Sequence, residues 1–190
     1  MRGLTGATAA ARAGSIAPGH VSRPGRPESF DGHSIELVTE ADLPDLLPLM
    51  RAYCDFYDAA PADEQLLALS RALLADPEHE GLQLIARDAK GAAVGFATVF
   101  WSWSTTSASR IGVMNDLYVL PSARGQGLAD HLIAACTERC ALRGAASLEW
   151  QTAPSNLRAQ AVYDRVGGKR EEWLNYTLEA SSERRTGREG

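Results

Sequence analysis

Residues 113–129 limit the possible folds of this 190-residue chain more than any other segment does. Their first part ends an expected strand over 111–120, which runs into Pro121, and then Gly125 and Gly127 open a long helical pattern. Backbone N–H groups at a helix N-terminus lack intrahelical partners and carry the positive end of the helix dipole. Glycines let a ligand approach that backbone closely. A strand, a glycine-rich turn and a helix in this order indicate a binding site for a pyrophosphate.

Two common nucleotide-binding folds do not fit this segment. The chain contains no G-x-x-x-x-G-K-[ST] motif, which excludes a P-loop nucleoside triphosphatase. It contains no G-x-G-x-x-G motif, and the strand comes late in the chain, which excludes the first unit of a Rossmann fold.

Hydrophobic periodicity predicts an α/β fold with a mixed sheet and about four flanking helices. The expected strands span 35–38, 82–87, 94–103, 111–120, 147–151 and 172–178, and the expected helices span 41–52, 61–74, 125–142 and 155–166.

Composition divides the chain into one domain and two tails. Residues 1–32 are rich in Gly, Ala, Ser, Pro and Arg without apolar periodicity, and we expect a disordered N-terminal extension there. The folded domain is expected over 33–179, followed by a charged tail over 180–190. Three cysteines, Cys54, Cys136 and Cys140, are too few and too irregular for a secreted disulfide framework and favour a cytoplasmic protein.

Charge and residue content also bear on possible partners. The net charge is −5, with the acidic excess in the middle of the chain, which argues against nucleic-acid binding. No stretch is long and apolar enough to predict a transmembrane helix. The four histidines lie far apart and there is no CxxC pair, so we expect no metal site.

Two motifs carry a resemblance to a known family. Arg124, Gly127 and Ala129 spell R-x-x-G-x-A, and Asn156, Ala159 and Tyr163 spell N-x-x-A-x-x-x-Y at helical spacing. Together and in this order they resemble the motifs of the GNAT superfamily of N-acetyltransferases. The resemblance covers about 35–178 and implies the GNAT fold, in which the sheet splays apart between two neighbouring parallel strands.

The resemblance implies that acetyl-CoA is the acyl donor, without a metal. The backbone of Leu117, Tyr118 and Val119 would pair with the pantetheine arm, and Asn156 would contact the same part of the cofactor. Tyr163 would lie beside the thioester sulfur and protonate the leaving thiolate, although a core tyrosine is the alternative. The pyrophosphate would be held by backbone N–H groups of Arg124, Gly125, Gln126, Gly127, Leu128 and Ala129.

The general base is less well defined. The run from Asn115 to Val119 resembles the corresponding strand of spermidine/spermine acetyltransferases, but Asn115 stands where those enzymes often have a carboxylate, and an amide is no base. Asp116 and Glu149 remain candidates, working through water, and Asp116 is an equally good candidate for a buried structural carboxylate. Alternation along the strand puts Asn115 and Asp116 on opposite faces of the sheet, so we expect that they do not both line the substrate pocket.

Residues expected to contact the acceptor follow the first helix. This segment combines aromatic and acidic groups, which suits an alkylammonium ion, at Tyr53, Asp55, Phe56, Tyr57 and Asp58. Trp103 is a further candidate for a wall of the substrate site, with aromatic core packing as its alternative.

These features predict an enzyme that transfers acetyl from acetyl-CoA to a primary amine of a small, polyamine-like or amino-acid-like substrate. The transfer would be a direct attack in a ternary complex. The alternatives are a protein lysine or N-terminal acetyltransferase and a non-catalytic acyl-CoA-binding module. A homodimer is possible, as in many relatives.

Overall fold

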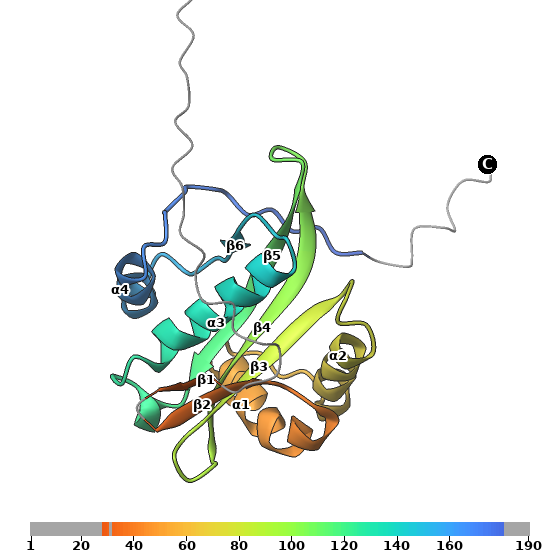
Figure 1. Cartoon of the computed structure of the whole chain (residues 1–190). Helices are drawn as coiled ribbons and strands as arrows, with labels where there is room; N and C mark the ends of the chain where they lie inside the picture. The colour runs from red at the N-terminus through yellow and green to blue at the C-terminus, as the bar shows by residue number, and fades with distance from the viewer. Residues whose placement is uncertain (1–27, 31, 181–190) are drawn as a thin grey trace, which may run out of the picture.

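A computed structural model describes residues 28–30 and 32–180 of the chain. In this part, six strands form one sheet in the order β1-β2-β3-β4-β5-β6 (Figure 1). All neighbouring pairs are antiparallel except β5 and β6, which are parallel. The mixed sheet expected from the sequence is therefore confirmed. The strands are β1 (Glu28–Phe30), β2 (His33–Leu37), β3 (Gly81–Arg87), β4 (Ala93–Ser104), β5 (Ser109–Val119) and β6 (Leu148–Glu149).

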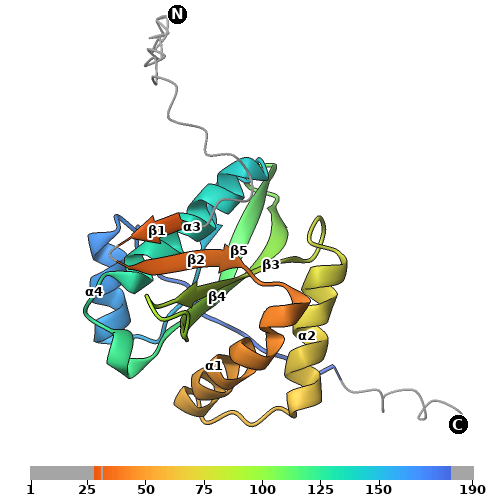
Figure 2. The ribbon, with the colours of Figure 1, turned by 60° about the horizontal axis from the view of Figure 1, so that its bottom comes forward.

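Helices cover both faces of the sheet (Figures 1 and 2). On one face α1 and α2 enclose a core that includes Leu46, Leu66 and Phe96. On the other face α3 encloses a core that includes Val99 and Leu132. The helices are α1 (Leu43–Phe56), α2 (Asp63–Ala75), α3 (Leu128–Leu142) and α4 (Leu157–Arg165), with short 3-10 turns at Glu40–Asp42 and Pro121–Ala123. In the described residues no helix combines the length and the apolar character that crossing a membrane requires.

Two helix boundaries differ from the expected ones in ways that matter for the site. α3 begins at Leu128 rather than at 125, because Gly125 and Gly127 have φ angles of +83° and +75° and so cannot continue a right-handed helix. α1 continues to Phe56, beyond the expected end at 52. Tyr53 therefore lies in the last helical turn.

The expected boundary between the extension and the domain is wrong by a few residues. Glu28–Phe30 forms β1 and pairs with β2, so the described fold begins before 33. The ring of Phe30 stacks on His131 of α3 with centroids 3.5 Å apart, which gives this short edge strand an aromatic anchor. Residues 1–27 and 181–190, which hold the rest of the expected extension and nearly all of the charged tail, lie outside the described residues.

The final strand expected over 172–178 is absent, and these described residues make no ladder pairing. The adjacent strand β6 is only two residues long, so it offers little backbone to pair with. The side-chain amides of Gln151, two residues after β6, and Asn175 hydrogen-bond to each other. Trp173 and Tyr176 are accordingly 80% and 90% exposed.

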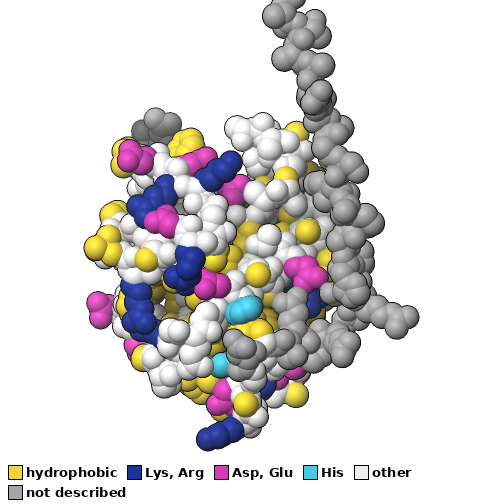
Figure 3. All heavy atoms as spheres, turned by 60° about the vertical axis from the view of Figure 1, so that its left-hand side comes forward, with side chains coloured by type: hydrophobic (Ala, Val, Ile, Leu, Met, Phe, Trp, Pro, Cys, Tyr) yellow, Lys and Arg dark blue, Asp and Glu magenta, His cyan; other side chains and the backbone are white. Residues whose placement is uncertain are grey.

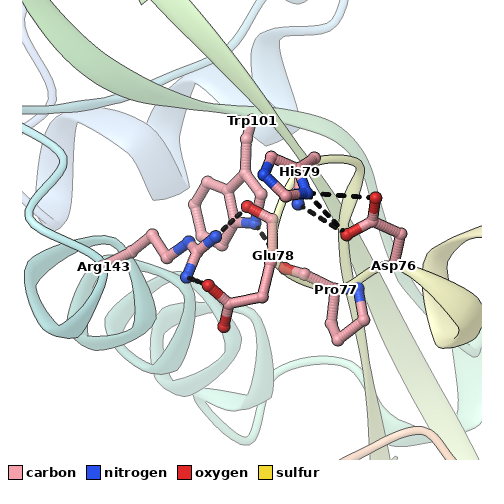
Figure 4. Close-up of polar contacts among 6 residues, drawn as sticks. All are labelled: Asp76, Pro77, Glu78, His79, Trp101 and Arg143. Atoms are coloured by element: carbon pink, nitrogen blue, oxygen red, sulfur yellow. Dashed lines mark hydrogen bonds and ion pairs between the residues drawn. The ribbon is translucent and has the colours of Figure 1, made fainter.

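A polar cluster joins the loop after α2 to β4 and to the end of α3 (Figure 4). The indole Nε1 of Trp101 donates to the carbonyl oxygen of Pro77 at 2.9 Å. The guanidinium of Arg143 lies 6.0 Å from the Trp101 ring and donates to both the carboxylate and the carbonyl oxygen of Glu78. The cluster therefore connects three segments that are far apart in the sequence.

We expect Arg143→Ala to lower the free energy of unfolding by about 1 kcal/mol, because it removes an ion pair and a cation–π contact at a partly exposed site. The measurement is urea unfolding followed by circular dichroism. Arg139→Ala is the matched control, since Arg139 is a basic residue in the last turn of the same helix. Equal losses in the two variants would mean that the cluster adds nothing beyond the helix-dipole effect.

Candidate active site

The candidate site lies where β5 and β6 separate. Their parallel ladder has two residue pairs, Gly112 with Leu148 and Val113 with Glu149, while β5 continues to Val119. A cavity of about 650 Å³ opens beside this free part of β5. It is lined by the end of α1 (Tyr53, Phe56, Tyr57), the end of β5 (Leu117, Tyr118, Val119), the turn and first residues of α3 (Ala123, Arg124, Gly125, Gly127, Leu128, Ala129, Asp130) and α4 (Asn156, Arg158, Ala159, Val162, Tyr163, Arg165).

The turn before α3 has the geometry of an anion site. Gly127 is the N-cap of α3 in the left-handed conformation, and Gly125 is left-handed as well. A Cβ atom added at Gly125 would meet no atom within 4 Å, so the space beside this backbone is open. These residues fit a pyrophosphate, which needs free backbone N–H groups and close approach. Of the expected cofactor residues in this turn, Gln126 alone is absent from the cavity lining and is exposed.

Arg124 supports the turn from the side of β5. Its Nε donates to the carbonyl oxygen of Val119 at 2.8 Å, and its guanidinium lies 5.8 Å from the Tyr118 ring. The arginine therefore ties the end of β5 to the glycine turn while still lining the cavity. The three β5 residues expected to pair with the pantetheine arm, Leu117, Tyr118 and Val119, line the same cavity.

The expected helical face of α4 is present. Asn156, Ala159 and Tyr163 all line the cavity. Asn156 is the N-cap of α4, and its side-chain Oδ1 accepts from the backbone N–H of Ala159 at 3.2 Å. Tyr163 packs edge-on against Trp150 with ring centroids 5.3 Å apart. Burial, together with the nearby Tyr57, raises the pKa of Tyr163, so its phenol remains protonated at neutral pH.

A β-bulge corrects the expected arrangement of Asn115 and Asp116. The register between β4 and β5 shifts between Thr98 and Val99, so that Asn115 is an extra residue in β5. Met114 and Leu117 both pack on the α3 side, which places the two residues between them on the α1 side. The amide Nδ2 of Asn115 donates to Asp116 Oδ1 at 3.0 Å. The expectation of opposite faces is therefore wrong.

Asp116 is a buried carboxylate close to the cavity but not among its lining residues. Burial raises its pKa, and the hydrogen bond from the Asn115 amide, together with the nearby hydroxyls of Thr98 and Tyr53, opposes this rise. Tyr53 does line the cavity, and its hydroxyl donates to the carbonyl oxygen of Asn115 at 3.1 Å. Burial and the negative charge of Asp116 raise the pKa of Tyr53. Tyr53 thus stands next to Asp116 at the wall of the cavity.

The other expected catalytic and substrate residues lie outside the lining. Glu149 is exposed on β6, where its carboxylate accepts from the Ser147 hydroxyl at 2.9 Å. Asp55 and Asp58 are exposed near the end of α1. Trp103 is 64% exposed and stacks on Arg110, near the outer end of the β4–β5 hairpin. The structure does not place Trp103 at the cavity, because the hairpin carries it toward solvent.

Phe56, which belongs to the segment expected to contact the acceptor, lines the cavity as well. The cavity also contains residues that the sequence did not indicate. Arg158 falls inside the second motif at an unspecified position. Asp130 and Arg165 come from different helices, and no sequence pattern links them.

Within residues 28–30 and 32–180, the buried thiols and the possible metal ligands form no second site. Burial raises the pKa of the Cys136 thiol to about 12 and that of Cys140 to about 11, which leaves both poor nucleophiles. No group of three His, Cys, Asp or Glu side chains in the described residues could hold a metal ion. On the face that includes α4, Figure 3 shows basic and acidic side chains intermixed rather than one broad basic surface.

Comparison with known proteins identifies similar sequences and folds. The sequence profile described as the acetyltransferase (GNAT) family matches residues 46–168. The uncharacterized N-acetyltransferase YhfO of Bacillus subtilis (strain 168) is 31% identical over 134 residues, which cover 70% of this chain and 88% of that protein. The crystal structure of a probable acetyltransferase is 29% identical, with a TM-score of 0.68 and coverage of 78% of this chain and 99% of that one.

More distant structures share the fold but differ in their named substrates. An aminoglycoside N-acetyltransferase in complex with CoA, AAC(6')-Iy, is 23% identical, with a TM-score of 0.63. The match covers 83% of this chain and 99% of that one. A ribosomal-protein-alanine N-acetyltransferase of Brucella melitensis biovar Abortus 2308 is 22% identical, with a TM-score of 0.61. The match covers 77% of this chain and 98% of that one. At these identities the likeness is one of fold alone.

We expect Gly125→Glu to weaken binding of acetyl-CoA at least tenfold more than Gly125→Gln. The two side chains have the same size and the same backbone strain, and only Glu adds a negative charge beside the turn that fits the pyrophosphate. Isothermal titration calorimetry measures both affinities. Equal affinities in the two variants would argue against a pyrophosphate at this turn.

The raised pKa of Asp116 predicts a pH-dependent effect on stability. A carboxyl group whose pKa is higher in the folded state stabilises the fold when protonated, and this contribution is lost as the pH rises through the raised pKa. Asp116→Asn should therefore raise the melting temperature at pH 7, and its advantage should shrink toward pH 4. Asp55→Asn, at an exposed carboxylate on α1, is the control. A lower melting temperature for Asp116→Asn at pH 7 would identify the carboxylate as a structural hydrogen-bond acceptor.

Proposed function

The chain belongs to the acetyltransferase (GNAT) family, and we propose that it transfers the acetyl group of acetyl-CoA to a primary amine of a small, cationic substrate. One observation carries the proposal: a single cavity is lined by the glycine turn before α3, the free part of β5 and Tyr163 of α4. This arrangement suits a long ligand with a diphosphate at one end and a thioester at the other.

The reaction needs little beyond correct placement of its two substrates. A neutral amine attacks the thioester carbonyl carbon directly, the C–N bond forms, and the C–S bond then breaks to release CoA as a thiolate. Holding the amine against the thioester supplies an effective molarity of about 10⁵ M or more. No covalent enzyme intermediate is required, which agrees with the inert character of the buried thiols.

Tyr163 is the proposed general acid for the leaving thiolate. Its pKa is raised by burial, so it holds its proton at the pH at which the amine reacts. A well-placed general acid typically contributes a factor of about 10²–10⁴ in rate.

Asp116 is the proposed base that receives the ammonium proton, through water or the Tyr53 hydroxyl rather than by direct contact. The raised pKa of this carboxylate brings it nearer to that of the ammonium group and makes it a better base than an exposed aspartate. Glu149 is the alternative base, but its exposure and its position outside the cavity lining favour it less.

The acceptor end of the cavity is aromatic. Tyr53, Phe56 and Tyr57 line it from α1, with the Tyr53 and Tyr57 rings edge-to-face and their centroids 5.1 Å apart. Aromatic faces next to a buried carboxylate favour an alkylammonium ion through cation–π attraction and charge. We therefore retain a polyamine-like amine, as in the spermidine/spermine branch, as the preferred acceptor.

A protein lysine or N-terminal amine is the second candidate acceptor. Phe56 and Tyr57 are 59% and 50% exposed, so this end of the cavity is open enough for a peptide to enter. A non-catalytic acyl-CoA-binding module is the third reading, and it predicts binding of acetyl-CoA without turnover. Assembly into a homodimer stays a proposal, to be tested by light scattering.

We expect Tyr163→Phe to lower kcat about 100-fold while changing the acetyl-CoA affinity by less than about twofold, because it removes the acid but keeps the ring. Thiol release from acetyl-CoA is measured against polyamines, aminoglycosides, single amino acids and a peptide with free lysine and N-terminal amines. Tyr176→Phe, at a residue that is 90% exposed, is the matched control.

The outcomes of this assay distinguish the two acceptor classes and the non-catalytic module. Turnover of polyamines supports the preferred acceptor, whereas turnover of the peptide alone supports the second. Binding of acetyl-CoA with no turnover of any amine supports the non-catalytic module. Full activity of Tyr163→Phe would limit that residue to a packing role.

A further inference from the structure

A carboxylate stands at the anion-binding end of the cavity. Asp130 lies in the first turn of α3, three residues after Gly127, and lines the cavity. A negative charge at this place stabilises the helix but repels a diphosphate bound to the same helix N-terminus. If acetyl-CoA binds as proposed, the Asp130 carboxylate should weaken its binding unless a second group offsets the repulsion.

Arg165, at the end of α4, pairs with this carboxylate. Its Nη2 donates to Asp130 Oδ1 and Oδ2 at 2.8 Å and 2.9 Å, and its Nε donates to Oδ2 at 3.2 Å. Both side chains line the cavity. The carboxylate thus occupies one edge of the guanidinium plane, which is the geometry that fixes an arginine most firmly.

The other edge of the same guanidinium is available to a ligand. An arginine carries five N–H donors in a rigid plane, two of them on Nη1. Within the described ranges no hydrogen bond joins the Arg165 Nη1 to another group. A planar guanidinium can bind a carboxylate along one edge and a phosphate oxygen along another.

Packing alone does not hold Arg165 in place. The helix α4 has no buried residue, and the Arg165 side chain is 58% exposed. The other two arginines of the cavity differ: Arg124 is tied to the end of β5 through Val119, and Arg158 is exposed at the start of α4. The position of the Arg165 guanidinium thus depends on Asp130.

We propose that Arg165 binds the diphosphate of acetyl-CoA and that Asp130 is a positioning residue that holds its guanidinium beside the N-terminus of α3. The inference rests on the proposed placement of acetyl-CoA. Asp130 therefore has two effects on the affinity for acetyl-CoA. It raises the affinity by positioning Arg165, and this gain exceeds the loss that its own negative charge causes.

The sign of the Asp130→Asn effect on CoA affinity tests this proposal. In the wild-type background the substitution frees Arg165 and should weaken binding about threefold or more. Arg165→Gln should weaken it about tenfold or more, the usual effect of losing a charge-assisted hydrogen bond. In the Arg165→Gln background, Asp130→Asn removes only repulsion and should tighten binding. Calorimetry with CoA measures all four affinities.

Two controls separate positioning from general stability. The exposed pair Asp164–Arg170 joins α4 to the segment that follows it, with a distance of 2.9 Å from Arg170 Nε to Asp164 Oδ1. Arg170→Gln and Asp164→Asn should leave CoA affinity unchanged. At saturating acetyl-CoA, kcat of Asp130→Asn should stay within about twofold of wild type while KM for acetyl-CoA rises.

Dephospho-CoA identifies the phosphate that Arg165 binds. An equal loss of affinity for CoA and dephospho-CoA in Arg165→Gln supports the diphosphate, whereas a loss confined to CoA would assign the 3′-phosphate and overturn the proposal. Tighter binding by Asp130→Asn in the wild-type background would also overturn it. A wild-type chain that binds neither compound would instead refute the proposed function itself.

Discussion

The early end of the ladder between β5 and β6 is the constraint on which the site depends. Backbone N–H and C=O groups of a strand need partners, and the end of β5 has none from β6 beyond Val113. The bulge at Asn115 bends β5 at the start of this free part. The strand edge is therefore open to a ligand with amide groups of its own, and α3 and α4 close the space around it.

The two ends of the cavity are lined by different kinds of chemical groups. One end has free backbone N–H groups and arginines, which suit phosphates, and the other has aromatic rings of α1 next to a buried carboxylate, which suit a cation. A donor with a diphosphate and an acceptor with an ammonium group have opposite charges. In the proposed reaction, this separation would let one cavity orient both substrates with the amine facing the thioester.

The expected site residues that line the cavity on β5, α3 and α4 lie on regular elements or at turns with strict backbone requirements. Asn156 and Tyr163 share a face because a helix has 3.6 residues per turn, and Gly127 caps α3 because its φ angle is positive. The failures have physical causes as well. The prediction of opposite faces for Asn115 and Asp116 was wrong because a bulge adds one residue to β5. The strand predicted over 172–178 does not form because it needs a partner strand longer than β6.

The sequence by itself determined the order of elements from β2 to α4, the glycine turn and the two motifs, because these follow from local backbone geometry and periodicity. Only the tertiary structure decided which side chains of different elements meet. The Asp130–Arg165 pair joins two helices, the contact of Tyr53 with Asn115 joins a helix to a strand, and Arg143 reaches the loop after α2. Such contacts depend on how the helices pack on the sheet, and that packing is set by the whole core rather than by any single segment.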